Sequence, residues 1–127
     1  MQTNFTKAQL VDPEIRVAND ILRSCVHCGF CAPTCPTYAL LGDELDGPRG
    51  RIYMIKGMME SGGNIPERVV THVDRCLSCL SCMTTCPSDV DYMHLVDIAR
   101  KRIEEMHRRP INERLFRWAL SKILPYQ

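Results

Sequence analysis

The sequence has few aromatic residues, no marked excess of either charge and no long apolar run. Three Phe, four Tyr and one Trp among 127 residues are too few for a bulky aromatic core. Sixteen basic and fifteen acidic residues leave a formal charge of +1, whereas general nucleic-acid binders carry a clear basic excess. No apolar stretch approaches the roughly 18 to 20 residues that a membrane span requires. We therefore expect neither a nucleic-acid partner nor a membrane-spanning segment.

Leader and catalytic motifs are also missing. The first residues, MQTNFTKAQLVDPE, lack the apolar core of a secretory signal peptide. We therefore expect a cytoplasmic chain, or one at the inner face of the cytoplasmic membrane. No glycine-rich phosphate loop, dinucleotide fingerprint or pairing of a nucleophile with a base is recognisable. These absences predict no catalytic residue and no substrate site in this chain.

Cysteine, by contrast, is abundant, with eight residues in two runs. The runs read CVHCGFCAPTCP at 25–36 and CLSCLSCMTTCP at 76–87. Both have the form C-x2-C-x2-C-x3-C-P, so they form an internal repeat in which each position lies 51 residues from its counterpart. Cytosolic thiols are kept reduced, and clustered cysteines there favour metal binding over disulfides.

The spacing of the first three cysteines favours a loop that wraps around a ligand. On a straight helix, Cys25 and Cys31 would lie about 9 Å apart along the axis, and an extended chain would separate them further. Neither arrangement reaches three corners of one small inorganic cube. Gly29 can adopt the unusual backbone angles of such a loop, although Leu80 at the matching position indicates that glycine is not required.

Four cysteines at this spacing, closed by proline, are the known signature of 4Fe–4S ligation in bacterial ferredoxins. In two-cluster ferredoxins the fourth cysteine of each run binds the other cluster. That rule predicts one cluster on Cys25, Cys28, Cys31 and Cys86, and the other on Cys76, Cys79, Cys82 and Cys35. A zinc-stabilised interaction domain is the alternative, but zinc sites usually show two well-separated cysteine pairs. His27 is not needed as a ligand because each run supplies four cysteines.

Several basic residues follow or precede the runs in the sequence. Each bound cluster with four thiolates is negatively charged, and this charge helps to set its reduction potential. The basic residues either offset that charge or form a solvated face; they are Arg23, Arg49, Arg51, Lys56 and Arg75.

Helical periodicity dominates the rest of the chain. Proline at a first helical position predicts several of the starts, and Ser88 with Asp91 has the form of a capping box. The expected helices run from Pro13 to the first cysteine run, Pro36 to Gly42, Pro48 to Gly62, Pro66 to the second run, Ser88 to Met106, and 112 to 124. No two-residue alternation indicates a strand. We expect an all-α fold, a helical ferredoxin whose loops between short helices bind two clusters.

The last segment differs from the rest. We expect a helical ferredoxin domain over 1–109 and an amphipathic tail helix over 110–127. Apolar residues cover more than half the circumference of this helix, so it requires a partner surface. Docking on protein is the favoured interpretation, and attachment to a membrane surface is the alternative. The apolar residues are Leu115, Phe116, Trp118, Ala119, Leu120, Ile123 and Leu124.

The two runs, with DGPRGRIYMIK between them, resemble the iron–sulfur subunit of glycolate oxidase (glycolate dehydrogenase). The runs alone also fit electron-transfer subunits of anaerobic glycerol-3-phosphate dehydrogenase, lactate-utilisation proteins, heterodisulfide reductase and fumarate reductase. The segment from Pro48 to Arg51 narrows the resemblance towards the glycolate group. A free-standing electron carrier or a module of one of the other complexes remains the alternative.

The resemblance implies an electron-transfer role. Family members take electrons from FAD-containing subunits that oxidise glycolate to glyoxylate, so FAD is expected on a partner and not on this chain. The electrons then pass towards the respiratory chain and its quinone at the inner face of the membrane. Family members continue into a larger C-terminal part with cysteine-rich CCG repeats, which this sequence lacks. The tail helix is therefore expected to be the junction to a missing C-terminal domain.

Overall fold

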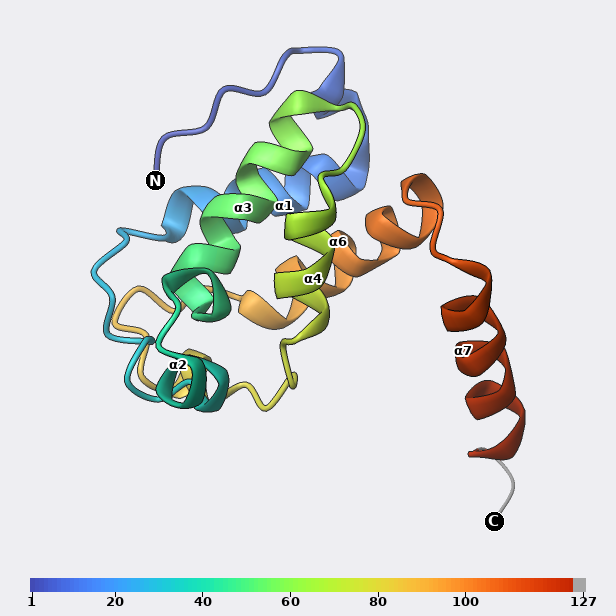
Figure 1. The fold of residues 1–127 in the computed structure, drawn as a ribbon. Helices are drawn as coiled ribbons and strands as arrows, with labels where there is room; N and C mark the ends of the chain where they lie inside the picture. The colour runs from blue at the N-terminus through green and yellow to red at the C-terminus, as the bar shows by residue number, and fades with distance from the viewer. Residues whose placement is uncertain (125–127) are drawn as a thin grey trace.

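The computed structural model of the chain describes residues 1–124, and this part consists of helices and loops without a strand (Figure 1). The predicted all-α class is confirmed. In chain order the elements are the 3-10 helix η1 (Gln9–Val11), α1 (Pro13–Ser24), α2 (Pro36–Leu41), the 3-10 helix η2 (Glu44–Asp46), α3 (Pro48–Ser61), α4 (Glu67–Asp74), α5 (Ser81–Thr84), α6 (Tyr92–Met106) and α7 (Ile111–Ile123).

Three of the helices start as the sequence predicts. α1, α2 and α3 have proline at their first position, where its fixed φ suits the helix and its missing N–H costs no hydrogen bond. The Asp12 carboxylate caps α1 by accepting a hydrogen bond from the Glu14 amide at 2.9 Å. Gly42 and Gly62 end α2 and α3 in the left-handed conformation, with φ of 68° and 58°, which favours glycine.

The core lies between α1, α3, α4 and α6, which pack into one bundle (Figure 1). Its least exposed apolar residues are Ala18, Leu22, Ile55, Val73, Leu95, Ala99 and Ile103. Met106 is 42% exposed, because it is the last residue of α6. The bundle holds both cysteine runs at one end.

The expected capping box at Ser88 is wrong. α6 begins at Tyr92, and its cap is the Asp91 carboxylate, which accepts a hydrogen bond from the His94 amide at 3.2 Å. Asp89 has a φ of 48°, which keeps the segment after Pro87 out of the helical conformation. Proline therefore opens a helix after the first run but not after the second.

Gly50 lies where α3 crosses η2, and it offers a matched test of packing. A Cβ at Gly50 would lie 2.1 Å from the Glu44 carbonyl oxygen, whereas a Cβ at Gly57, in the same helix, would meet no atom within 4 Å. Gly50→Ala is expected to destabilise the fold by about 1–3 kcal/mol, because the backbone of η2 must move. Gly57→Ala is expected to stabilise it by up to about 1 kcal/mol. Thermal unfolding followed by circular dichroism compares the two, and equal midpoints would contradict the packing described.

The tail helix α7 stands away from the bundle (Figure 1). Its start is held by Arg109, which pairs with Asp74 at 2.6 Å and with Glu104 at 2.7 Å. Leu115, Phe116 and Trp118 are each at least 60% exposed. The observed bounds agree with the helix expected over 112–124, and residues 125–127 of the expected tail segment lie outside the described residues. None of the helices described is both long and apolar enough to cross a bilayer.

Candidate metal centres

The two cysteine runs lie side by side at one end of the bundle (Figure 1). The hydroxyl groups of Thr34 and Thr85, which occupy matching positions in the repeat, are 3.4 Å apart. The thiols line two adjacent cavities. Cysteines at the first are Cys25, Cys28, Cys31, Cys82 and Cys86, and those at the second are Cys35, Cys76, Cys79 and Cys82.

Each cavity thus joins thiols from both runs. Cys86 reaches the cavity of the first run, Cys35 reaches that of the second, and Cys82 lines both. We refer to the first cavity as site 1 and to the second as site 2. Cys28 at site 1 and Cys79 at site 2, which are repeat counterparts, are exposed. The structure therefore brings together every cysteine that the sequence singled out.

The loops repeat in conformation as well as in sequence. His27 and Ser78 are counterparts with φ of 61° and 52°, and Gly29 and Leu80 are counterparts with φ of 87° and 59°. Leucine thus adopts a left-handed backbone conformation that L-residues seldom adopt, and glycine is not required at this position of the loop. The first run has no helix before α2, whereas in the second Cys82 lies on the short helix α5. The expectation of a loop is therefore only partly correct for the second run.

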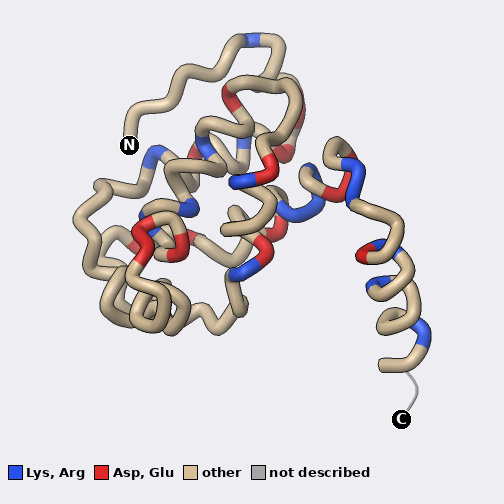
Figure 2. Tube along the Cα trace, in the orientation of Figure 1, with Lys and Arg blue, Asp and Glu red and all other residues tan. Residues whose placement is uncertain are grey.

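Charged side chains are absent from the loops themselves. Neither Cys25 to Gly42 nor Cys76 to Ser88 contains Lys, Arg, Asp or Glu, and Figure 2 shows the corresponding end of the described fold free of both colours. Charges that act on the sites therefore come from residues outside the loops, among them the N-terminal ammonium of Met1, which donates to the Cys25 carbonyl oxygen.

The sulfur positions do not suit a single metal ion. In a tetrahedral zinc site with Zn–S bonds of about 2.3 Å, the sulfurs are about 3.8 Å apart. Within residues 1–124, the only group of three potential ligand atoms within 4.8 Å of one another is Asp43, Asp46 and His72. No three cysteine sulfurs approach that closely. Widely spaced thiols without carboxylate partners fit a larger iron–sulfur core.

That group of three is not a cation site, because the Asp46 carboxylate is already paired. Asp46 is 1% exposed, and its two oxygens lie 2.8 Å from His72 Nδ1 and 3.0 Å from Arg75 Nη1. Arg51 Nη2 lies 3.5 Å from the same carboxylate. Burial raises the pKa of Asp46, but hydrogen bonds from His72 and Arg75 outweigh it, so that the net pKa is lowered.

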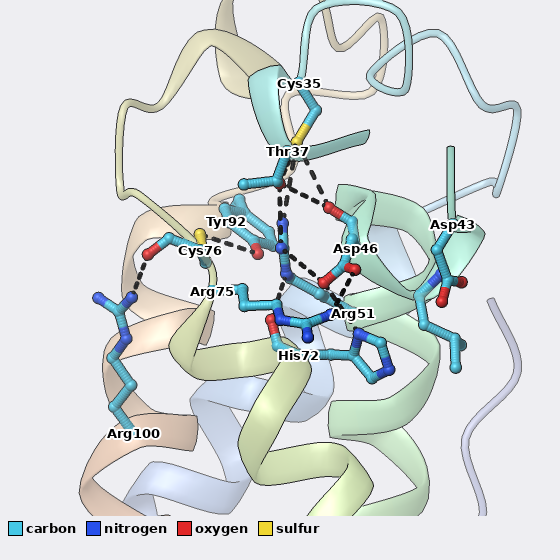
Figure 3. A network of polar contacts seen from close by, with 11 residues as sticks. Cys35, Thr37, Asp43, Asp46, Arg51, His72, Arg75, Cys76, Tyr92 and Arg100 are labelled. Atoms are coloured by element: carbon cyan, nitrogen blue, oxygen red, sulfur yellow. Dashed lines mark hydrogen bonds and ion pairs between the residues drawn. The ribbon is translucent and has the colours of Figure 1, made fainter. Parts of the chain in front are cut away.

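Arg51 connects this buried carboxylate to site 2 (Figure 3). Its guanidinium is 1% exposed, donates from Nε to the His72 carbonyl at 2.7 Å, and donates from Nη2 to the Thr37 hydroxyl at 3.0 Å. Nη1 lies 3.8 Å from Cys35 Sγ. A buried cation thus faces one of the thiols of site 2.

Cys35 has several neighbours that stabilise a thiolate, although its sulfur also lies 3.6 Å from the Asp46 carbonyl oxygen. Its sulfur lies 3.2 Å from the Thr37 hydroxyl, in addition to its contact with Arg51. Burial raises the pKa of the Cys35 thiol, but hydrogen bonds from the Thr37 side chain, the amides of Tyr38 and Thr37, and Arg51 lower it below its ordinary value. By contrast, burial raises the pKa of Cys31, and raises that of Cys82 to about 12.

The sulfur of Cys76, also at site 2, accepts a hydrogen bond from a hydroxyl group on α6. The Tyr92 hydroxyl donates to Cys76 Sγ at 3.5 Å, and burial raises the pKa of Tyr92 well above its ordinary value, so that this hydroxyl keeps its proton. Arg100 donates to the Cys76 carbonyl at 2.6 Å and to the Ser78 hydroxyl at 2.7 Å. Figure 3 shows Tyr92 and Arg100 on opposite sides of this loop segment.

Site 1 has fewer polar neighbours among the described residues. The Val90 amide donates to Cys86 Sγ at 3.5 Å, and His27 Nδ1 lies 3.9 Å from Cys25 Sγ. Burial, followed by the charge of Arg49, lowers the pKa of His27, which favours the neutral imidazole.

The five basic residues singled out in the sequence have different positions. Arg49 lines site 1 and Arg51 lines site 2, whereas Arg75 acts through Asp46 and Lys56 pairs with Glu60 at 3.6 Å. No side-chain hydrogen bond or ion pair is found for Arg23 among the described residues. The sequence did not identify Asp46, His72, Thr37 and Tyr92 as neighbours of the sites. The DGPRGR segment, which contains Asp46 and Arg51, was the available signal.

The chain resembles known iron–sulfur proteins. Residues 24–90 match the family described as "4Fe-4S dicluster domain". The "Glycolate oxidase iron-sulfur subunit" of Escherichia coli (strain K12) is 51% identical over 125 residues, which cover 98% of this chain and 30% of that protein. The "Probable glycolate oxidase iron-sulfur subunit" of Bacillus subtilis (strain 168) is 37% identical, over 84% of this chain and 24% of that protein.

More distant similarity extends to another enzyme class. One subunit of the dihydromethanophenazine:CoB–CoM heterodisulfide reductase of Methanosarcina mazei is 30% identical over 79% of this chain and 26% of that protein. The chain thus spans less than a third of the length of these relatives. No solved structure matches it.

Proposed function

We propose, from the premise that this chain belongs to the 4Fe–4S dicluster domain family, that it is the electron-transfer part of a flavin-dependent glycolate oxidase. Two 4Fe–4S clusters are its cofactors. When bound, each cluster takes up and releases one electron at a time, and no substrate is converted on this chain. The single observation that carries the proposal is the pair of adjacent cavities, each lined by thiols from both cysteine runs.

The ligand sets follow the cross-ligation rule of two-cluster ferredoxins. Cys25, Cys28, Cys31 and Cys86 hold the cluster at site 1, and Cys76, Cys79, Cys82 and Cys35 hold the cluster at site 2. Cys35 supports this assignment because it lines site 2 alone, and Cys86 supports it because it lines site 1 alone. Cys82 borders both sites, and its place in the second run assigns it to site 2.

The partner is an FAD-containing subunit that oxidises glycolate to glyoxylate, releasing two electrons and two protons. This chain relays the electrons singly towards a quinone of the respiratory chain, at the inner face of the cytoplasmic membrane. The 51% and 37% identities to glycolate oxidase iron–sulfur subunits support this substrate. The 30% identity to part of a heterodisulfide reductase is lower and does not favour that alternative.

Residues 110–127 form the junction from the ferredoxin domain, 1–109, to a further C-terminal domain of a longer protein. The exposed Leu115, Phe116 and Ile123 support this assignment, because a monomeric surface seldom carries such an apolar helix face. Arg114, Arg117 and Ser121 lie on the opposite, polar side of α7, at helical spacing.

The test of the function is reduction of the clusters by glycolate. The anaerobically purified chain is mixed with its copurifying flavoprotein and glycolate, and loss of visible absorbance is followed together with electron paramagnetic resonance. We expect reduction by glycolate only when the flavoprotein is present, and none by glycerol 3-phosphate. Reduction by glycerol 3-phosphate but not glycolate would overturn the assignment of substrate.

Limited proteolysis of the longer protein, which includes the proposed C-terminal domain, tests the junction. Phe116→Asp places a charge on the apolar face of α7, and Ser121→Asp places the same charge on its polar face. The junction predicts that Phe116→Asp alone exposes the segment near residue 110 to limited proteolysis. Equal cleavage of both variants would refute a docked apolar face.

A further inference from the structure

The two sites differ in charge although their loops repeat. At site 2, the Arg51 guanidinium faces Cys35 Sγ at 3.8 Å, and the Tyr92 hydroxyl donates to Cys76 Sγ at 3.5 Å. At site 1, the sulfur contacts found among residues 1–124 come from neutral groups, the backbone amide of Val90 and the imidazole of His27. Within these residues, a guanidinium therefore contacts a sulfur atom only at site 2, whereas at site 1 the N-terminal ammonium of Met1 donates to the Cys25 carbonyl oxygen and not to a sulfur.

The positive charge at site 2 is not cancelled by its carboxylate partner. Asp46 is shared among His72, Arg51 and Arg75, so Asp46 and the two arginines carry one net positive charge, with the Arg75 side chain 49% exposed. Arg51 and Asp46 are each 1% exposed, where water screens charge weakly.

Arg49, which lines site 1, differs from Arg51 in its net charge with its partner and in its exposure. Its Nε lies 2.6 Å from a Glu44 carboxylate oxygen, and the two side chains are 35% and 43% exposed. The pair is neutral overall, and exposed pairs of this kind have weak effects.

Reduction of an iron–sulfur cluster adds a negative charge that spreads onto its thiolates. Positive charge and hydrogen bonds near those sulfurs stabilise the reduced state more than the oxidised one. We propose that Arg51, positioned by Asp46, together with Tyr92 raises the reduction potential of site 2 above that of site 1. Electron transfer within the chain is then downhill from site 1 to site 2. This inference rests on the two-cluster relay of the proposed function, and it adds the direction in which electrons move between the clusters.

A redox titration of the whole chain with both clusters tests this inference. Dithionite and mediators poise the potential, and electron paramagnetic resonance reports each reduced cluster. The Cys79→Ser chain shows which signal belongs to site 2. We expect this signal to have the higher midpoint in the wild type. At that midpoint potential, Arg51→Gln is expected to lower the ratio of reduced to oxidised cluster at site 2 about tenfold. This corresponds to a midpoint lower by about 59 mV for one electron.

Tyr92→Phe removes one hydroxyl and keeps the buried ring. It therefore tests the effect on the potential of site 2 even if Arg51→Gln fails to hold both clusters. We expect it to lower the same ratio roughly threefold, while the ratio at site 1 stays constant. Lys56→Gln, at a basic residue of α3 that lines neither cavity, is the control and should change neither midpoint by a comparable amount. A higher midpoint at site 1, or a Tyr92→Phe chain with about eight iron atoms and an unchanged site 2, would overturn the inference. Because dithionite replaces the flavoprotein, this result is independent of whether glycolate is the substrate.

Discussion

Replacing Cys35 by serine is expected to remove most of the cluster at site 2, although Cys35 belongs to the first run. Its sulfur lines the cavity of Cys76 and Cys79 and does not line site 1. Cys86→Ser is expected to remove the cluster at site 1 for the same reason. In each variant the iron content should fall from about eight to about four atoms per chain, because a serine hydroxyl is a poor substitute for a thiolate.

The exposed cysteines supply matched controls. Cys28→Ser and Cys79→Ser each remove a proposed ligand that lines only one site, so they identify the resonance signal of that site. Cys35→Ser should then lose the same signal as Cys79→Ser, and Cys86→Ser the same signal as Cys28→Ser. If Cys35→Ser instead reproduced the spectrum of Cys28→Ser, the ligand sets would be wrong.

Asp46→Asn is expected to cause the largest loss of stability of any single polar substitution. The change keeps the shape of the side chain but leaves Arg51, which is 1% exposed, without its charged partner. Breaking a buried ion pair in this way costs about 3–5 kcal/mol. The midpoint of thermal unfolding should therefore fall by about 10 °C or more, as measured by circular dichroism on the anaerobic protein with both clusters.

Glu44→Gln is the comparison for this prediction, because it breaks the exposed pair with Arg49 and should cost no more than about 1 kcal/mol. The lowered pKa of Asp46 adds a dependence on pH. Its contribution is complete above the unfolded pKa of about 3.9 and is lost as the pH falls through the lower folded pKa. An Asp46→Asn chain as stable as Glu44→Gln would show that the buried network does not hold the fold together.

Local signals in the sequence predicted the helices well. Proline at the starts of α1, α2 and α3 and glycine at the ends of α2 and α3 act within one turn, so they can be read without knowledge of the fold. The capping box predicted at Ser88 was wrong because Asp89 adopts a positive φ and the conformation of the chain around Cys86 is set by the site. The short helix α5 was missed because it consists of four residues within a cysteine run.

The cysteines could be predicted as a group because their spacing is itself the signal. The groups that act on them could not, because they meet only in the fold. Asp46 and His72 are 26 residues apart, and Tyr92 and Cys76 are 16 apart. Their contacts depend on how α3, α4 and α6 pack around the sites, and no local pattern records that packing.

Cys28 and Cys79 face solvent at equivalent places in the two loops. In the proposed ligand sets, the iron atom bound by each of them is consequently the one that dissolved oxygen and chelators would reach first. Oxidative loss of iron should start at these two corners, and a protein surface that covers both loops would protect the cofactors as well as exchange electrons with them.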